Sequence, residues 1–186
     1  MSFALVIDEE GTLIQVSDLR QEELRGKKKV LMPRTMNVPA REKRSVNISS
    51  NFLCDNSTYF LGMDSKGKPE RSIQCFKACA ERHAMLLKDV DSAAARAVKA
   101  YFSRWNPAEA EDNPLIQQYQ KELYAGANMV FQVNGEFAHE DNLCRNAWDK
   151  EKEDISDAVV MQCLVTGEYE PVAIRLEERR VGKECR

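Results

Sequence analysis

The sequence predicts an α+β fold with a small antiparallel sheet, hairpins and about four helices. Apolar segments that flank turn motifs occur near both ends of the chain, whereas the middle shows helix end signals and helical spacing of apolar residues. The chain has 186 residues, of which 43% are hydrophobic, and this is enough for one domain with a real core. We therefore expect a folded protein without repeats or low-complexity segments.

The chain is expected to open with a β-hairpin. Phe3–Ile7 and residues 12–16 are apolar segments on either side of a turn at residues 8–11, where Gly11 allows a tight bend. Residues 26–50 follow as a basic stretch with two prolines and no apolar periodicity. Because such a composition is typical of connecting segments, we expect an extended surface loop there.

Three helices are expected in the middle of the chain, over about residues 70–88, 92–104 and 114–124. Asp91 is predicted to cap the second helix, because a side-chain oxygen just before the first turn can accept a free backbone N–H. The third helix has signals at both ends: Asn113 as N-cap, Pro114 at the first helical position and Gly126 just past the end.

The rest of the chain returns to strands and turns. Its predicted elements are strands at residues 129–133 and 136–138, a helix at about 140–152, and strands at 159–165 and 172–176. Asn134-Gly135 is a strong hairpin signal, because both residues tolerate the positive φ of a two-residue turn. The last two strands are predicted to flank a turn at residues 166–171.

Composition and motifs argue against several classes of protein. The net charge is only -3, so any binding of nucleic acid must depend on where the charges lie rather than on their sum. No apolar run is long enough to cross a membrane, and the first residues lack the features of a signal peptide, so we expect a cytoplasmic protein. No nucleotide-binding fingerprint or paired-carboxylate motif is present, which leaves an enzyme unsupported.

Six cysteines are spread along the chain: Cys54, Cys75, Cys79, Cys144, Cys163 and Cys185. A chain of this size does not need disulfides, so we expect reduced thiols, with Cys163 on a strand and facing the core. Cys75, Cys79 and His83 share one predicted helix, where zinc would lack a fourth ligand and a Cys–His nucleophile would lack oxyanion donors. The helix also has an apolar stripe, formed by Ile73, Phe76, Ala80, His83 and Leu87. We expect core packing here, with no metal, cofactor or catalytic residue.

Positive charge is concentrated in the predicted loop, at Lys27, Lys28, Lys29, Arg34, Arg41, Lys43 and Arg44. Polar residues follow it, at Asn47, Ser49, Asn51 and Asn56. Lysine and arginine neutralise phosphates, whereas Asn and Ser can hydrogen-bond base edges and phosphate oxygens. Together these residues form the candidate nucleic-acid-binding site. The alternative is a solvated charged face followed by asparagines that cap helices and fix turns, with an apolar core set of Phe52, Leu53, Tyr59 and Phe60.

A series of short motifs occurs in order along the chain: ALVID at residues 4–8, the lysine-rich loop, NFLCDN at 51–56, YFLGMD at 59–64, Cys75-Phe76, His83, NMVF at 128–131, FAHED at 137–141 and QCLVTGE at 162–168. Together they resemble the amino-terminal region of the large subunit of the type I-C (Dvulg subtype) CRISPR-associated Cascade complex. The likeness runs from about residue 4 to about residue 174. Several motifs in one order are far more specific than any one of them.

The resemblance implies a domain organisation. Members of that family are much longer, so residues 1–176 are expected to be an amino-terminal α+β region, a fragment of a larger multi-domain subunit. Residues 177–186, EERRVGKECR, resemble vector-derived sequence instead of the expected continuation. We expect these last residues to be a non-native tail.

The resemblance also implies a function, as a subunit of an RNA-guided surveillance complex in antiviral defence. The implied partners are double-stranded target DNA, crRNA-containing Cascade subunits and a recruited helicase-nuclease, and the subunit would not itself be an enzyme. Guide pairing supplies the long sequence specificity, so the protein need read only the short protospacer-adjacent motif (PAM) and hold the DNA backbone. Two alternatives stay open: a protein-only interaction module, or, less favoured, an enzyme that depends on Cys75, Cys79 and His83.

Overall fold

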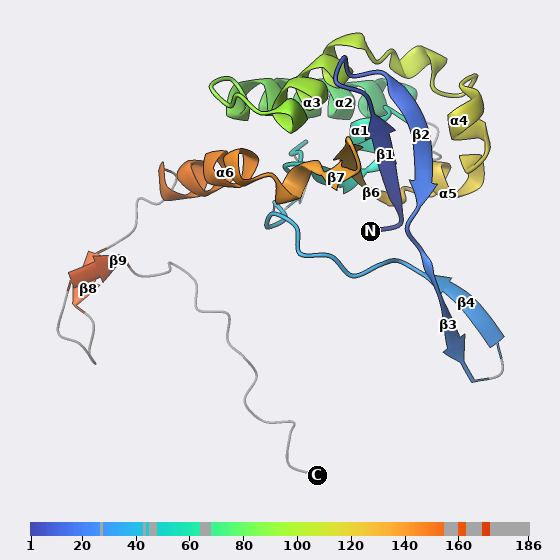
Figure 1. Cartoon of the computed structure of the whole chain (residues 1–186), viewed down its shortest axis with the longest axis horizontal. Coiled ribbons are helices and arrows are strands. Elements are labelled where there is room, and N and C mark those ends of the chain that lie inside the picture. Colours follow the sequence, from blue (N-terminus) through green and yellow to red (C-terminus); the bar gives the residue numbers. More distant parts are fainter. Residues whose placement is uncertain are drawn as a thin grey trace. The chain divides into compact units, whose positions relative to one another are not determined.

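A computed structural model of the chain describes residues 1–26, 28–42, 44, 48–63, 68–154, 160–162 and 169–171. The chain forms two compact units, Met1–Asp149 and Lys150–Arg186. The first unit holds a five-stranded sheet, a separate two-stranded hairpin and most of the helices (Figure 1). The described part of the second unit holds the end of one helix and another two-stranded hairpin. The predicted α+β fold class is therefore confirmed.

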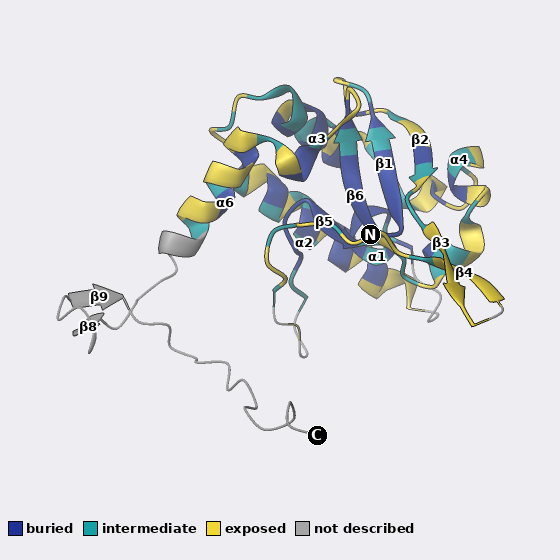
Figure 2. Cartoon of the chain, turned by 60° about the horizontal axis from the view of Figure 1, so that its bottom comes forward, coloured by how far each residue is buried: buried dark blue, intermediate teal, exposed yellow. Residues whose placement is uncertain are grey.

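The main sheet has the strand order β2-β1-β6-β5, with β7 paired to β6. Its strands are β1 (Phe3–Ile7), β2 (Leu13–Asp18), β5 (Cys54–Asn56), β6 (Asn128–Val133) and β7 (Glu136–Phe137). β1 pairs antiparallel with β2 but parallel with β6, so the sheet is mixed and not wholly antiparallel as expected. A parallel neighbour requires a long crossover, which the intervening helices provide. β1 and most of β6 are buried (Figure 2), which explains the continuous apolar sequence of β1 and the apolar run at residues 129–131 in β6.

Six α-helices lie in the described residues: α1 (Ser57–Phe60), α2 (Pro69–Leu86), α3 (Ala93–Arg104), α4 (Pro114–Gln117), α5 (Gln120–Tyr124) and α6 (Asn142–Asp154). Short 3-10 helices form at η1 (Pro107–Glu109) and η2 (Ala138–Glu140). α3 packs against β1 and β6, and α4 packs against β2. More helices form than the four expected, because the segment 114–124 divides in two and the single turn of α1 is too short to show periodicity. None of the described helices is long and apolar enough to cross a membrane.

The helix caps follow the sequence signals with one correction. Asn113 caps α4 as expected, with its side chain accepting a backbone N–H of the first turn. Ser92, not Asp91, caps α3, because its Oγ accepts the N–H of Ala95 at 3.1 Å. Asp91 lies one position earlier and pairs instead with Arg96 on the surface.

Residues 26–50 do not form a single loop, which corrects the prediction. β3 (Gln21–Arg25) and β4 (Lys28–Met32) form an antiparallel hairpin, and every residue of the two strands except Met32 is exposed. Because neither face of this hairpin is buried, its sequence lacks the apolar alternation by which strands are recognised. The described residues between β4 and β5 contain no helix or strand.

The second unit contains β8 (Val160–Gln162) and β9 (Tyr169–Pro171), which pair antiparallel. β8 lies within the expected strand at 159–165, but β9 lies where a turn was expected. β9 ends on a proline, a residue typical of turns that can nevertheless close a short strand. The expected strand at 172–176 and Cys163 lie outside the described residues.

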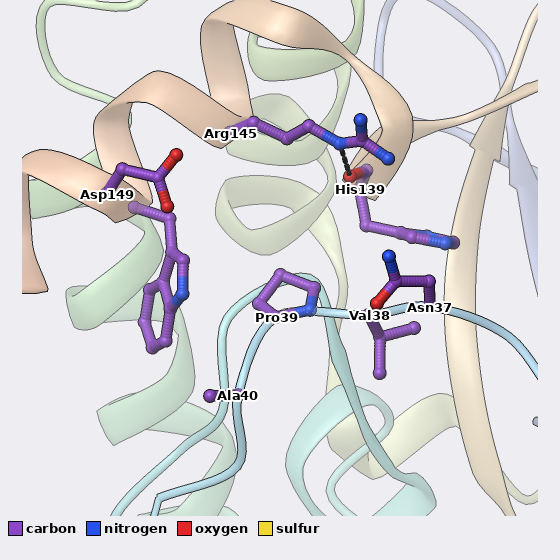
Figure 3. Close-up of a pocket in the computed structure, with 8 residues that line it drawn as sticks. Asn37, Val38, Pro39, Ala40, His139, Arg145 and Asp149 are labelled. Atoms are coloured by element: carbon purple, nitrogen blue, oxygen red, sulfur yellow. Dashed lines mark hydrogen bonds between the residues drawn. The ribbon is translucent and has the colours of Figure 1, made fainter.

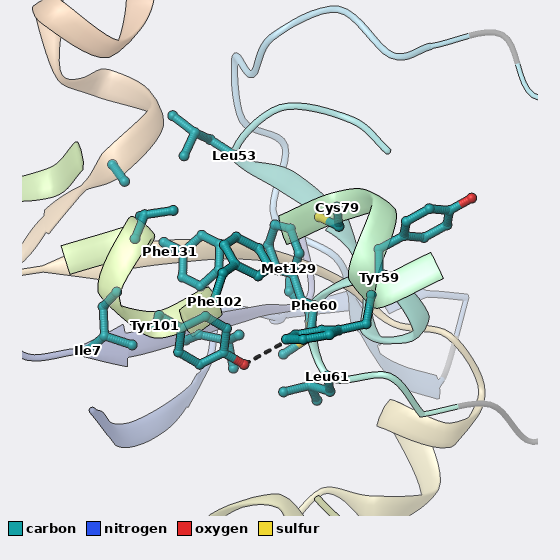
Figure 4. Close-up of a cluster of buried hydrophobic side chains, with 14 of the residues drawn as sticks. Ile7, Leu53, Tyr59, Phe60, Leu61, Cys79, Tyr101, Phe102, Met129 and Phe131 are labelled. Atoms are coloured by element: carbon teal, nitrogen blue, oxygen red, sulfur yellow. Dashed lines mark hydrogen bonds between the residues drawn. The ribbon is translucent and has the colours of Figure 1, made fainter. Parts of the chain in front are cut away.

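The core of the first unit is rich in aromatic side chains (Figure 4). The rings of Phe60 and Phe131 stack with their centroids 4.5 Å apart, and the ring of Tyr101 meets Phe131 edge-on. The hydroxyl of Tyr101 donates to the Phe60 carbonyl at 2.9 Å, so its polar atom is satisfied although the residue is fully buried. Phe52, Leu53, Tyr59 and Phe60 are all buried, as the alternative interpretation of this segment predicts.

α2 contributes the Cys–His set to the core. Cys75, Cys79 and His83 are all buried, which confirms their predicted packing role, and the described cysteines carry free thiols. Ile73 is an exception to the predicted stripe, because it is 38% exposed. The buried face of α2 includes Ser72, and the next residue along a helix points about 100° away.

Candidate nucleic-acid interface

The hairpin of β3 and β4 carries positive charge at its turn. Arg25 lies opposite Lys28, and Gly26 between them has a φ of 65°, which suits a tight turn. Lys29 follows, with its Nζ 2.9 Å from the Glu22 carboxylate; both side chains are more than half exposed, so this ion pair is weak. The hairpin extends away from the main sheet (Figures 1 and 2). Its cationic end is therefore open to a partner.

One face of the same hairpin also carries apolar side chains. Leu24 and Leu31 share this face, because Leu24 pairs with Lys29 and strand side chains alternate between faces. They are 74% and 50% exposed, and Val30 on the opposite face is 38% exposed. Leucines beside lysines on an exposed hairpin form a surface that can contact either nucleic acid or protein.

Arg44 is tied into the fold at a different place. Its guanidinium binds both carboxylate oxygens of Asp55 and lies 4.0 Å from the centre of the Tyr59 ring. The Asp55 side chain is only 1% exposed, and it also accepts the backbone N–H groups of Asn51 and Asn56, each at 2.8 Å. Burial raises the pKa of Asp55, whereas the bond from Arg44 acts in the opposite direction. Arg44 is thus the counter-ion of a buried carboxyl group.

The side-chain amides of Asn51 and Asn56 hold the backbone around this ion pair. Asn51 is 5% exposed, and its Oδ1 accepts the N–H of Glu42 at 2.9 Å. Asn56 is the N-cap of α1, and its Oδ1 accepts the N–H of Thr58 at 3.1 Å. These are the bonds of turn-fixing and capping residues, the alternative that the sequence left open.

The other candidates lie along the segment that follows the hairpin. Arg34 donates its backbone N–H to the Met1 carbonyl at 2.9 Å, and its guanidinium lies 5.9 Å from the centre of the Phe137 ring. Arg41 is exposed. The pKa of the Met1 amino group is lowered mainly by burial, and the positive charge of Arg41 is the second cause. Ser49 is partly exposed. Three candidates lie outside the described residues: Lys27, Lys43 and Asn47.

The predicted cations therefore fall on two elements rather than on one loop. Lys28 and Lys29 belong to the hairpin, whereas Arg34, Arg41 and Arg44 belong to the segment after it. Sequence patterns did not point to Arg25, which joins the lysines at the turn only because β3 and β4 pair. The signal that could have revealed this hairpin is Gly26, a turn residue that stands between two segments each long enough for a strand.

Cys79 and His83 are arranged as packing residues. Nδ1 of His83 lies 2.8 Å from the Cys79 carbonyl, and its Nε2 accepts the N–H of Leu53 at 3.0 Å, so both ring nitrogens have backbone partners. Burial raises the pKa of the Cys79 thiol well above its usual range, which disfavours the nucleophilic thiolate. Among the described residues, no group of three or more His, Cys, Asp and Glu side chains could hold a metal ion.

A cavity of about 260 Å³ lies between the segment after the hairpin and the start of α6 (Figure 3). Its lining residues are Asn37, Val38, Pro39, Ala40, His139, Arg145, Trp148 and Asp149. Nε of Arg145 donates to the His139 carbonyl at 3.2 Å, which joins η2 to α6. The two sides of the cavity, residues 37–40 and 139–149, are far apart in the sequence, so no local motif could have predicted it.

Comparison with known families places the chain among the CRISPR-associated proteins. The family model described as CRISPR-associated protein (Cas_Csd1) matches residues 1–182, nearly the whole chain. The chain belongs to this family. No curated protein sequence matches it. The resemblance in the sequence is thus confirmed at the level of a CRISPR-associated protein.

Proposed function

We propose that this chain is the amino-terminal region of the large subunit of a type I-C Cascade complex and takes part in PAM recognition on target DNA. The observation that carries the proposal is the exposed β3–β4 hairpin with Arg25, Lys28 and Lys29 at its turn. Membership of the CRISPR-associated family supplies the biological context. In this role the chain binds DNA and partner subunits and is not an enzyme.

The hairpin suits a duplex for a geometric and an electrostatic reason. The major groove of B-DNA admits a two-stranded β-ribbon, and cations at the end of a ribbon can reach phosphates or guanine edges. Arg25 and Lys28 form one cross-strand pair, so their side chains share a face, while Lys29 lies on the other face. We propose that this turn supplies the DNA contacts that the sequence assigned to a loop.

Asn51 and Asn56 have a supporting role in this proposal. A bidentate contact to adenine uses both the oxygen and the nitrogen of an amide, and in both residues Oδ1 already accepts a backbone N–H. We propose that they shape the segment that carries Arg41, Arg44 and Ser49, while guide pairing supplies the long sequence specificity. The crRNA-containing subunits and a helicase-nuclease are the proposed protein partners.

One observation favours a second function, a protein-only interaction module. Leu24 and Leu31 are among the most exposed large apolar side chains of the described residues, and a protein partner could cover them. This alternative predicts that the hairpin binds protein and that the chain shows no salt-dependent affinity for DNA.

The test replaces Lys27, Lys28 and Lys29 by Glu in the full chain and measures binding to duplex DNA over a range of salt concentrations. Affinity should fall on all sequences, and the log-log salt slope should shrink by about 0.9 for each phosphate that the variant no longer neutralises. A control variant with the same charge change replaces three exposed lysines elsewhere, Lys77, Lys88 and Lys121. Equal effects of the two triple variants, or an unchanged slope, would refute the role of the hairpin.

A further inference from the structure

The cavity beside α6 contains a buried polar side chain without a partner. His139 is 2% exposed, and neither of its ring nitrogens has a hydrogen-bond partner among the described residues. A carboxylate oxygen of Glu140 lies 4.0 Å from Nε2, beyond hydrogen-bond distance. A buried polar group without a partner costs free energy, so a ligand that supplies the missing bonds would bind with an advantage.

The state of His139 indicates what kind of ligand would satisfy it. Burial lowers the pKa of the imidazole and so favours the neutral ring. A neutral imidazole offers one N–H donor and one lone-pair acceptor. Asn37, which lines the same cavity, adds an amide donor and acceptor (Figure 3). A ligand that carries donors and acceptors on one edge would match all of these groups, whereas a simple anion could use only the donors.

Part of the cavity lining is apolar, and one of these apolar side chains is held firmly in place. Pro39 and Trp148 both line it. The indole of Trp148 stacks on the ring of Phe52 with centroids 5.6 Å apart and planes 2° from parallel, which fixes its orientation in the core. Such walls suit a planar aromatic ligand.

The lining carries one arginine, Arg145, and one acidic residue, Asp149. The Arg145 side chain is exposed. Its Nε donates to the His139 carbonyl, and among the described residues no side-chain hydrogen bond is seen from its two terminal nitrogens. Arg41 follows the lining residue Ala40 directly, and Arg34 precedes Asn37 by three positions. A single strand whose base entered the cavity could place a phosphate at Arg145, which lines it.

We propose that this cavity binds one unpaired nucleobase of a single-stranded nucleic acid, between the 37–40 segment and η2–α6. The base edge meets His139 and Asn37, its face meets Pro39 and Trp148, and Arg145 contacts a phosphate. The site is separate from the cationic turn of the β3–β4 hairpin and does not require duplex binding. The strand can be DNA or RNA, because both offer the same base edges and phosphates.

The chain has only two histidines, His83 and His139, which makes NMR of the imidazoles a direct test. The full chain, labelled at histidine, is titrated with the four deoxynucleoside monophosphates, with their ribose counterparts, with short DNA and RNA strands, and with inorganic phosphate. Nucleotides and strands should shift the His139 signals and leave those of His83 unchanged. The relative affinities of the DNA and RNA strands identify the source of the base. A shift with phosphate alone of equal size, or no shift of His139 with any nucleotide or strand, would overturn the proposal.

Two variants sharpen the test. His139→Phe removes the polar groups and should weaken binding of short strands by about tenfold or more. Arg145→Ala removes an exposed side chain that lines the cavity and should also weaken the binding of short strands. Asn146→Ala changes an exposed neighbour that does not line the cavity and should leave this binding unchanged. If His139→Phe lowers the melting temperature, the comparison of Arg145→Ala with Asn146→Ala decides. Equal affinities of those two variants would count against the proposal.

The triple lysine variant of the hairpin should retain nucleotide binding, which separates this site from the proposed duplex contact.

Discussion

Leu53 has a backbone conformation that leucine rarely adopts, and His83 stabilises it. Its φ of 54° lies in the left-handed region, which costs a non-glycine residue about 1–2 kcal/mol. The N–H of Leu53 donates to Nε2 of His83, and the ring of Phe52 stacks on the same imidazole. His83 therefore connects α2 to the start of β5 and must be neutral to accept this bond.

The burial of His83 predicts that the protein loses stability as the pH falls. The pKa of His83 is lowered by burial from 6.5 to about 4, so between these values the unfolded chain takes up a proton that the folded chain does not. The free energy of unfolding should be unaffected by His83 above pH 6.5 and should fall below it by about 1.4 kcal/mol per pH unit, about 3 kcal/mol by pH 4. Urea unfolding at pH 7 and pH 5 measures the part of this loss that falls above pH 5, about 2 kcal/mol. In His83→Gln the loss of unfolding free energy between pH 7 and pH 5 should be smaller by the contribution of His83. Parallel pH profiles of the two proteins would show that His83 is not the group responsible.

Substitution of Asn56 can distinguish a residue that caps a helix from a residue that reads a base edge. Asn56→Ala removes the cap of α1 and should cost about 1 kcal/mol of stability, while the preference for the correct PAM in an assembled complex should be unchanged. Asn51→Ala should likewise lose stability, because the Glu42 N–H loses its acceptor. Melting curves and a PAM-library binding assay on both variants provide the measurement. A loss of PAM discrimination of about 1–3 kcal/mol with normal stability would show base reading instead.

At the scale of elements, the β3–β4 hairpin is held by its own ladder more than by the core. Its side chains are exposed on both faces, and a two-stranded hairpin is only marginally stable by itself. Gln21 and Met32 are the pair closest to the main sheet. The hairpin therefore adds surface and charge to the fold but little buried apolar area, as a binding element would.

Removing the hairpin should thus leave the fold intact. Replacing residues 22–31 by two glycines joins the paired residues Gln21 and Met32 by a short turn. The melting temperature should change by less than about 4 °C, because the hairpin buries little surface, whereas duplex binding should fall as far as in the triple lysine variant. Differential scanning calorimetry and DNA titration test the two halves of this prediction. A large loss of stability would show that the hairpin is part of the structural core.

At the scale of the whole molecule, the first unit depends on the pairing of its first strand with a strand far along the chain. β1 pairs in parallel with β6, in register from Phe3 with Met129 to Ile7 with Val133. The helices between them supply the crossover, and α3 covers both strands. This arrangement brings the segment after the hairpin close to η2 and α6, where the cavity forms.

The candidate site shows how far local sequence can predict function. The cations and amides were recognisable as residue types, but their availability depends on the partners that the fold brings to them. Arg44 binds Asp55, and Asn51 accepts the N–H of Glu42, so their side chains are already engaged within the protein. Arg25 gained its place beside the lysines only through strand pairing.

The sequence by itself determined the features that depend on neighbours within a few positions: the β1–β2 hairpin, the Asn113 cap, the Asn134-Gly135 turn and the buried stripe around Cys79 and His83. Turn geometry, capping and periodicity are local, so short motifs suffice to predict them. Only the tertiary structure decided the parallel pairing of β1 with β6, the exposure of the β3–β4 hairpin and the cavity around His139. Each of these depends on contacts between residues far apart in the chain, or on what the rest of the fold leaves uncovered, and no local pattern encodes either.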